Sequence, residues 1–143
     1  MVLLARDVAE TEFLLMSKET FAFDAAKVMK EKRHGFVIVK GDDGKPVGIV
    51  TEWDYLSKIV AEGRDPSNTK LVEIMTPNVI TIQSKEEITS IAKLMHDRGI
   101  RRLLVVEDGK ILGIITAKTV LANIEEYVNR LSAQIARLQT PQF

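Results

Sequence analysis

The order of apolar and polar residues predicts the same set of elements twice. In each half, a short apolar strand precedes an amphipathic helix, a two-stranded hairpin and a second helix. In the first half these elements span residues 13–16, 21–32, 36–40, 46–51 and from 52 to about 62. In the second half they span 79–82, 84–98, 103–106, 111–116 and from about 117 onward. The pattern therefore predicts a mixed α/β (α+β) chain of two β-α-β-β-α units.

Residues with turn and cap chemistry mark the element boundaries. The first hairpin turns at Gly41-Asp42-Asp43-Gly44 and the second at Glu107-Asp108-Gly109-Lys110. Asp42, Asp43 and Gly44 resemble a calcium loop only superficially, and we interpret them as a turn. Ser84, with Glu87 three residues later, has the signature of a capping box and predicts the start of a helix.

Direct alignment shows that the halves are copies of one unit. Residues 8–42 align with 74–108 at an offset of 66, and after the extra residue Asp43, residues 44–60 align with 109–125 at an offset of 65. Twelve aligned pairs are identical, and the single gap falls inside a hairpin turn. The expected domains are a first repeat at 5–62, a linker at 63–70, a second repeat at 71–125 and a C-terminal helical extension at 126–143.

One copy has about the smallest size that folds alone. We therefore expect the two copies to pack sheet to sheet about a pseudo-twofold axis. The clefts between them would be lined by both copies and are natural ligand sites.

Composition narrows the class of protein. The chain has 20 basic and 20 acidic residues, and this balance is not typical of proteins that bind nucleic-acid backbones. It has no cysteine, which excludes disulfides and thiolate sites. No run of apolar residues is long enough for a signal peptide or a membrane helix. We expect a cytoplasmic globular protein with neither a nucleic acid nor a membrane as partner.

The segment from Gly48 to Asp54 offers the clearest candidate chemistry. A buried strand runs directly into a helix at Thr51, where free backbone N–H groups and the positive end of the helix dipole suit a phosphate. Asp54, one turn later, could accept hydrogen bonds from both hydroxyls of a ribose. The same Thr-x-x-Asp spacing is close to a capping box and would occur without any ligand. From these residues alone, both interpretations stay open.

The repeated unit resembles the cystathionine β-synthase (CBS) domain family, whose domains occur in pairs called Bateman modules. The resemblance rests on Gly-Ile-Val-Thr-Glu-Trp-Asp at 48–54, Gly-Ile-Ile-Thr-Ala-Lys-Thr at 113–119 and the lead-in Val-Glu-Ile-Met-Thr-Pro at 72–77. It covers about residues 5–125. It implies a regulatory module that binds an adenosine compound, such as AMP, ADP, ATP or S-adenosylmethionine, and signals to a protein partner.

The resemblance also implies particular site residues. Thr51 and Asp54 of the first copy would hold phosphate and ribose, and basic residues of the second copy would face the phosphates. Those basic residues are Arg101, Arg102 and Lys118, and the adenine would rest on Leu14, Leu15 and Val37. Three cations against the one carboxylate of Asp54 leave two positive charges, which matches a nucleoside monophosphate.

The reciprocal site is degenerate by the same comparison. Thr119 stands at the acidic position, Gly35 and Phe36 at the basic pair, and Trp53 at the lysine position. Thr116 and nearby His34 remain as its polar candidates. Trp53 could flank a bound adenosine, lie in a dimer contact or pack at the start of its helix.

The C-terminal extension carries a heptad pattern. Apolar residues step by three and four positions through Leu121, Ile124, Val128, Leu131, Ile135 and Leu138. We expect Leu121 and Ile124 to serve the domain core and the later four to pair with another chain, although they could also fold back onto their own module. The chain is expected to be a homodimer in which this seam supplements a disc-like dimer of the kind the resembled family forms.

Catalysis and metal binding find little support in the sequence. His34 and His96 are the only histidines, and neither has a second ligand at metal spacing. No nucleophile–base pair or carboxylate pair can be assembled. We expect neither an enzyme nor a metal site. The alternative to a ligand sensor is a CBS-fold dimerisation or interaction module that binds no ligand.

Overall fold

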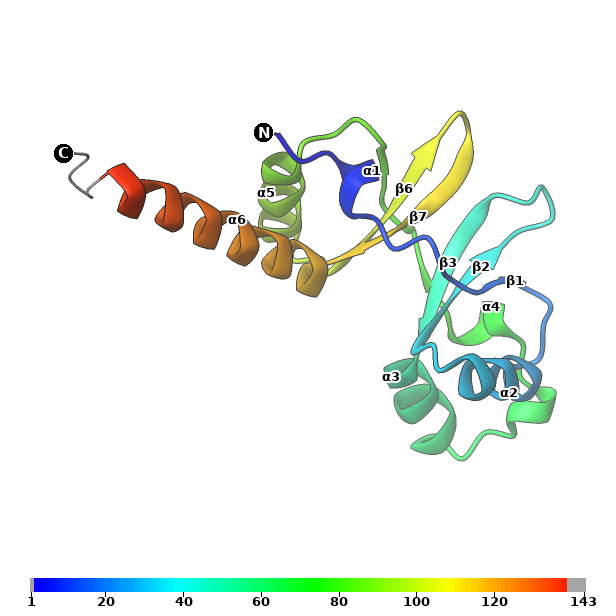
Figure 1. Ribbon diagram of the computed structural model, residues 1–143. Coiled ribbons are helices and arrows are strands. Elements are labelled where there is room, and N and C mark those ends of the chain that lie inside the picture. Colours follow the sequence, from blue (N-terminus) through cyan, green and yellow to red (C-terminus); the bar gives the residue numbers. More distant parts are fainter. Residues whose placement is uncertain (1, 139–143) are drawn as a thin grey trace. The chain divides into compact units, whose positions relative to one another are not determined.

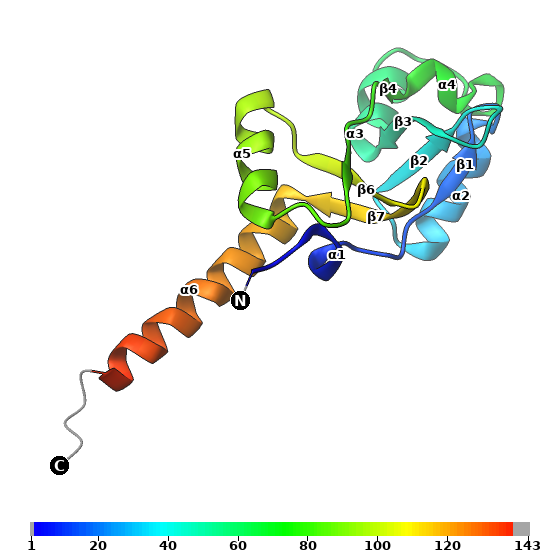
Figure 2. The same cartoon turned by 90° about the horizontal axis from the view of Figure 1, so that it is seen from above.

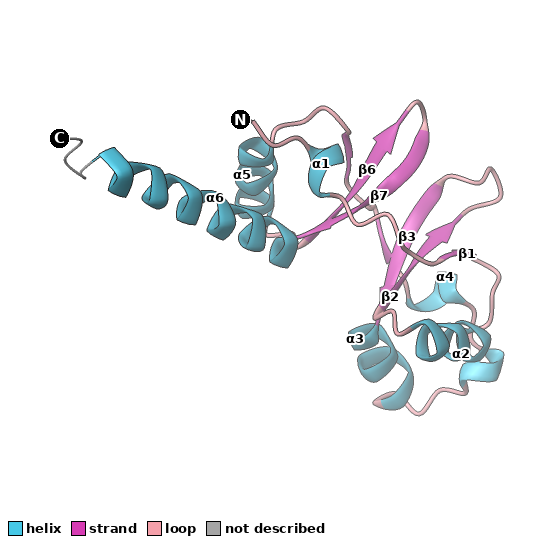
Figure 3. Cartoon of the chain, viewed as in Figure 1, coloured by secondary structure: helices cyan, strands magenta, loops and turns pink. Residues whose placement is uncertain are grey.

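The chain forms two compact units, one built from a continuous stretch and the other from two separated segments of the sequence. The structure, a computed structural model, describes residues 2–138 (Figure 1). The first-repeat unit is Glu12–Ile80, and the second-repeat unit joins Met1–Thr11 to Thr81–Phe143. The mixed α/β class predicted from the sequence is confirmed, with one sheet in each unit (Figure 3).

The first-repeat unit contains a four-stranded sheet in the order β1-β2-β3-β4. β1 pairs parallel with β2, and β2–β3 and β3–β4 pair antiparallel. The strands are β1 (Leu15–Ser17), β2 (Phe36–Lys40), β3 (Pro46–Thr51) and β4 (Thr76–Pro77). The helices are α2 (Ala22–Lys32), α3 (Glu52–Asp54), which continues into a π-helix at Tyr55–Val60, a 3₁₀ turn at Pro66–Asn68, and α4 (Leu71–Ile74).

The core of this unit lies between the sheet and its helices. Alternate residues of the central strands, Val37, Val39 and Val50, are fully buried. They pack with one face of α2 and with Leu71 and Ile74 of α4. The hydrophobic face that the strand period predicts is therefore covered largely by α2 and α4.

The second-repeat unit repeats this plan with a three-stranded sheet in the order β5-β6-β7. Its elements are α1 (Ala5–Val8), β5 (Thr81–Gln83), α5 (Ile88–Arg98), β6 (Arg102–Glu107), β7 (Lys110–Thr116) and α6 (Ala117–Leu138). The β6–β7 hairpin turns through Asp108 (φ 51°) and Gly109 (φ 76°). The backbone of both residues is in the left-handed conformation, as a tight two-residue hairpin turn requires.

Each unit is completed by the segment with which the other repeat begins. β4, in the opening segment of the second repeat, pairs with Gly48 and Ile49 of β3. Glu10, in the opening segment of the first repeat, bridges Ile114 of β7 through two backbone hydrogen bonds of 2.8 and 3.0 Å.

The close approach of these lead-in segments explains two of the repeated glycines. A Cβ at Gly48 would lie 2.8 Å from the carbonyl oxygen of Thr76, and one at Gly113 would lie 2.4 Å from that of Glu10. Neither position has room for a side chain.

The predicted capping box at Ser84 is wrong. α5 begins at Ile88, and the Ile88 N–H donates to the backbone carbonyl of Leu3 at 2.9 Å. The lead-in segment thus satisfies the helix start, a partner that local spacing does not reveal. The buried Ser84 hydroxyl lies 2.9 Å from a carboxylate oxygen of Glu107.

The expectation that Leu121 and Ile124 serve the core is also wrong. Leu121 is 67% exposed and Ile124 is 37% exposed. Val120 is the buried residue of α6, because the helix turns this neighbouring face toward its unit. No helix within residues 2–138 combines the length and hydrophobicity that a membrane span needs.

Candidate functional site

The junction of β3 and α3 forms the capping box that the Thr-x-x-Asp spacing allows. The backbone N–H of Thr51 donates to Oδ2 of Asp54 at 2.8 Å, and the Thr51 hydroxyl donates to the same oxygen at 3.2 Å. The backbone of Thr51 is extended while α3 begins at Glu52. The helix start is therefore stabilised by Thr51 and Asp54 without a ligand.

The other oxygen of Asp54 has a cationic partner that sequence reasoning missed. Asp54 is 4% exposed, and Nζ of Lys58 lies 2.9 Å from its Oδ1. The same ammonium donates to the backbone carbonyl of Ile74 at 2.8 Å. The spacing of four residues along a helical segment was the available signal. Both oxygens of the Asp54 carboxylate therefore already have partners. A ribose that binds Asp54 would have to share the carboxylate with Lys58 or displace the Lys58 ammonium.

The corresponding junction of β7 and α6 has hydroxyls where the first has a carboxylate. The hydroxyl oxygens of Thr116 and Thr119 lie 2.9 Å apart, and the Thr119 N–H donates to the Thr116 hydroxyl at 3.2 Å. The Thr119 hydroxyl in turn donates to Oε1 of Glu10 at 2.9 Å. Glu10 thus brings an exposed carboxylate to the junction that lacks its own, from 109 positions away in the sequence.

The three candidate phosphate-binding cations lie at the same end of one hairpin. Arg102 pairs with Thr116 across β6 and β7, and the N–H of Ala117 donates to the carbonyl of Arg101 at 2.9 Å. Lys118 follows as the second residue of α6. All three side chains are exposed, and none forms an ion pair with an acidic residue within 2–138. This end of the unit therefore carries uncompensated positive charge.

The predicted adenine contacts differ in accessibility. Leu15 is 40% exposed, and Leu14 is half-buried against the core of its unit. Val37 is fully buried within that core, so its side chain has no surface to offer a ligand. Trp53 is 68% exposed, which removes the interpretation that it packs at the start of its helix.

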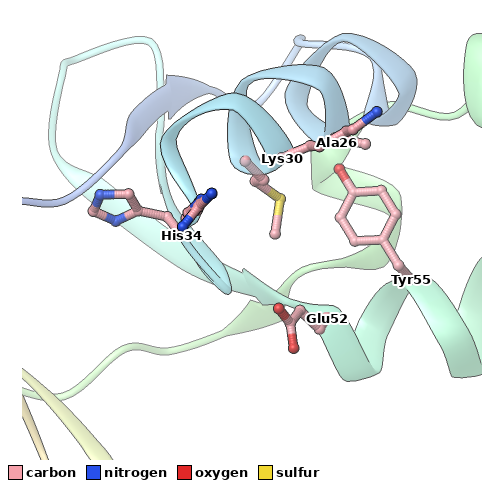
Figure 4. Close-up of a pocket in the computed structure, with 7 residues that line it drawn as sticks. Ala26, Lys30, His34, Glu52 and Tyr55 are labelled. Atoms are coloured by element: carbon pink, nitrogen blue, oxygen red, sulfur yellow. The ribbon is translucent and has the colours of Figure 1, made fainter.

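His34, a candidate for the degenerate site, lines a pocket of about 390 Å³ in the first-repeat unit (Figure 4). The half-buried ring makes an edge contact with Phe36. The other lining residues are Ala26, Met29, Lys30, Arg33, Glu52 and Tyr55. No group of three or more potential metal ligands occurs in the described part of the chain.

Tyr55 fixes the helix that follows Thr51 against α2. Its hydroxyl donates to the backbone carbonyl of Ala22 at 2.7 Å, and Figure 4 shows it directed toward α2. Burial raises the pKa of Tyr55 to about 12, because the phenolate would lose its hydration. This contact holds the Thr51–Asp54 junction in place.

Each unit thus contains one half of the predicted site. Thr51 and Asp54 belong to the first-repeat unit with Leu14 and Leu15, whereas Arg101, Arg102 and Lys118 belong to the second-repeat unit.

Comparison with known proteins identifies the repeat. An uncharacterized protein of Methanopyrus kandleri is 34% identical over 137 residues, which cover 90% of this chain and 70% of that protein. The solved hexameric CBS-CP12 protein from bloom-forming cyanobacteria is 32% identical with a TM-score of 0.76, over 85% of this chain and 67% of that one. The CBS domain pair of protein MJ0100, solved with 5′-methylthioadenosine and S-adenosyl-L-methionine, is 26% identical with a TM-score of 0.75, over 89% and 99%.

The family match follows the internal repeat. Residues 5–61 and 71–126 each match the CBS domain. The chain therefore belongs to the CBS domain family, and it carries two of these domains in tandem.

Proposed function

We propose that this chain is a regulatory module that binds an adenosine compound carrying phosphate and signals its presence to a protein partner. One observation supports this most directly: Arg101, Arg102 and Lys118 form an exposed cluster beside the start of α6, and none of them pairs with an acidic residue within 2–138. Guanidinium groups and helix N-termini are both suited to phosphate. In this proposal the opposite side of the ligand meets Thr51, Asp54, Leu14 and Leu15.

The adenosine part of the proposal is supported by the relative MJ0100, which binds two adenosine compounds. Its ligand S-adenosylmethionine is a cation, however, and the Arg101–Arg102–Lys118 cluster would repel a positive group. Lys58 already neutralises Asp54, so all three cations are available to an anion. We therefore expect AMP, ADP or ATP to bind more tightly than S-adenosylmethionine or 5′-methylthioadenosine.

Calorimetric titration with AMP, ADP, ATP, S-adenosylmethionine and adenosine tests this order. Phosphate recognition requires that the nucleotides exceed adenosine in affinity. Equal affinity for adenosine and AMP would refute the role of the three cations. Failure of all five compounds to bind would refute the function as stated.

The second candidate is an interaction module without a physiological ligand. The observation that favours it is the capping box, since the polar groups of Thr51, Asp54 and Lys58 are hydrogen-bonded to one another. A thermal-shift series separates the two functions, because a ligand that binds only the native state raises the melting temperature. No shift with any adenosine compound at millimolar concentration would favour the interaction module.

Self-association is part of both candidates. The cyanobacterial relative is hexameric. The described helices of this chain expose several large apolar side chains, including Trp53, Leu56 and Val60 in the first-repeat unit and Leu121 in the second. We propose a homodimer as the smallest assembly. In both candidates the module binds and does not catalyse a reaction.

A further inference from the structure

The later turns of α6, beyond Val120, contain no buried residue. α6 is 22 residues long and contacts α1, α5 and β7. Val120, in its first turn, is its buried residue. Figures 1 and 2 both show the later turns extending away from the other elements of this unit.

These turns present a continuous apolar stripe, which we call the tail seam: Val128, Leu131, Ile135 and Leu138. Their exposed fractions are 51, 39, 52 and 84%. The spacing of three and four residues places all four on one side of the helix. Because most helical stability in proteins comes from packing of an apolar face, a partner along the seam would stabilise these turns.

The identity of the seam residues selects the kind of partner. In heptad terms Val128 and Ile135 occupy a positions, and Leu131 and Leu138 occupy d positions. β-branched residues at a with leucine at d favour two parallel helices over higher assemblies. Identical seams related by a twofold axis along the helices satisfy this pattern.

The charges of α6 also fit a second copy of the same helix. The positions that flank the seam hold Glu125, Tyr127, Ser132 and Gln134, so only one of them is charged. Glu126 and Arg130 lie farther out and form an ion pair within their own helix. Two identical helices can therefore approach without strong repulsion and without a partner of opposite charge.

A membrane surface is the other common partner for an amphipathic helix. Such helices usually carry a basic polar face. From Leu121 to Leu138, α6 has two acidic and two basic residues. This balance disfavours an anionic lipid surface as the partner.

We propose that the α6 helices of two chains pair in parallel through the tail seam. The four seam residues form about one and a half heptads, too few to hold a coiled coil by themselves. The pairing therefore adds to other contacts between the two copies and fixes their C-terminal helices side by side. It does not depend on any nucleotide.

Single cysteines test the pairing directly, because the chain has none of its own. The variants are Leu131→Cys in the seam and Asn129→Cys on the outer face of the same turn, both exposed. Under mild oxidation without nucleotide, parallel pairing places the two Leu131→Cys thiols within disulfide reach and keeps the two Asn129→Cys thiols apart. We expect Leu131→Cys to form a disulfide-linked dimer at least tenfold faster.

The alternative arrangements give different results. Equal rates for the two variants, or no cross-link in either, would overturn the proposal. A mixture of Val128→Cys and Leu138→Cys chains reports antiparallel pairing, and faster cross-linking in that mixture than in Leu131→Cys alone would also overturn it.

A second measurement does not rely on cysteine. Ile135→Asp places two carboxylates in the seam and should lower the helix content measured by circular dichroism, together with the dimer affinity measured by sedimentation. Asn129→Asp adds the same charge outside the seam and should change neither. Equal effects of the two variants would contradict the proposal, whereas failure of nucleotide binding would leave it intact.

Discussion

Lys58 lies 2.9 Å from the buried carboxylate of Asp54 and donates to the carbonyl of Ile74 at the end of α4. A single ammonium therefore joins the proposed ribose acceptor to the segment that leads into the second repeat. Desolvation of the Asp54 carboxylate is offset by Lys58 and by the two Thr51 donors. Any ligand that takes Asp54 acts on this ion pair.

The ion pair should be visible in stability. Lys58→Met keeps the length of the side chain but leaves Asp54 buried without its cation. A buried charge without its partner costs about 3–5 kcal/mol. Because the Lys58 side chain is 41% exposed, solvent screens the charge, and we expect a loss in unfolding free energy of about 1–2 kcal/mol.

A double-mutant cycle isolates the interaction. The combination of Lys58→Met with Asp54→Asn should lose less stability than the sum of the single variants, as measured by urea unfolding. Additive losses would show that the two residues are not coupled. Lys93→Met, which removes an exposed ion pair with Asp97, is the control and should cost about 0.5 kcal/mol or less.

Asp54 should contribute most to ribose recognition. A hydrogen bond to a charged group is worth about 1.5–3 kcal/mol, so Asp54→Ala should weaken nucleotide affinity by roughly ten- to a hundredfold. Calorimetry measures the change, and circular dichroism checks that the variant is folded. Asp24→Ala, an exposed aspartate on α2, is the control. Unchanged nucleotide affinity in a folded Asp54→Ala protein would contradict the proposed ribose site.

Arg102 should distinguish AMP from adenosine. Only AMP offers a phosphate for a bidentate contact with the guanidinium. Arg102→Ala should therefore weaken AMP binding by roughly tenfold or more while it leaves adenosine nearly unchanged. Arg137→Ala, at the exposed end of α6, should affect neither ligand. Equal losses for both ligands would show that Arg102 shapes the cleft without reading phosphate.

One nucleotide should bind tightly per chain. The junction at Thr116 lacks an acidic residue of its own, and its predicted basic positions are Gly35 and Phe36. Calorimetry at micromolar protein should give a ratio near one. A ratio of two with equal affinities would contradict the asymmetry. Glu10→Ala would then show whether the Glu10 carboxylate beside Thr119 replaces the missing aspartate.

Tyr55 predicts a pH dependence of stability at high pH. The pKa of Tyr55 is raised from 10.0 to about 12 in the folded chain. The contribution of the protonated Tyr55 to the free energy of unfolding is therefore fully present below pH 10 and is lost as the pH rises toward 12. Tyr55→Phe should cost about 1 kcal/mol at pH 8 through loss of the hydrogen bond to Ala22.

The difference between wild type and Tyr55→Phe should narrow from pH 10 upward in urea unfolding experiments. Tyr127→Phe, at the second and 45% exposed tyrosine, serves as the matched control. A difference that stays constant up to pH 11.5 would contradict the role of Tyr55.

Much of the fold was predictable because local chemistry controls it. The periods of apolar residues gave the strands and helices to within a few positions, and the turn residues at Asp108 and Gly109 marked a hairpin that the structure confirms. The spacing of Thr51 and Asp54 indicated a capping box as one of two interpretations, and the structure shows this capping box. The repeat itself followed from pairwise identity along the chain.

Only the tertiary structure decided which distant segments complete each unit. The acceptor for the Ile88 N–H is Leu3, the partner of Thr119 is Glu10, and the strand beside Gly48 is formed by Thr76 and Pro77. These contacts join residues far apart in the sequence, and no local period or propensity encodes them. They depend on which backbone groups and apolar faces remain unsatisfied once the repeats have formed, and that is a property of the folded chain.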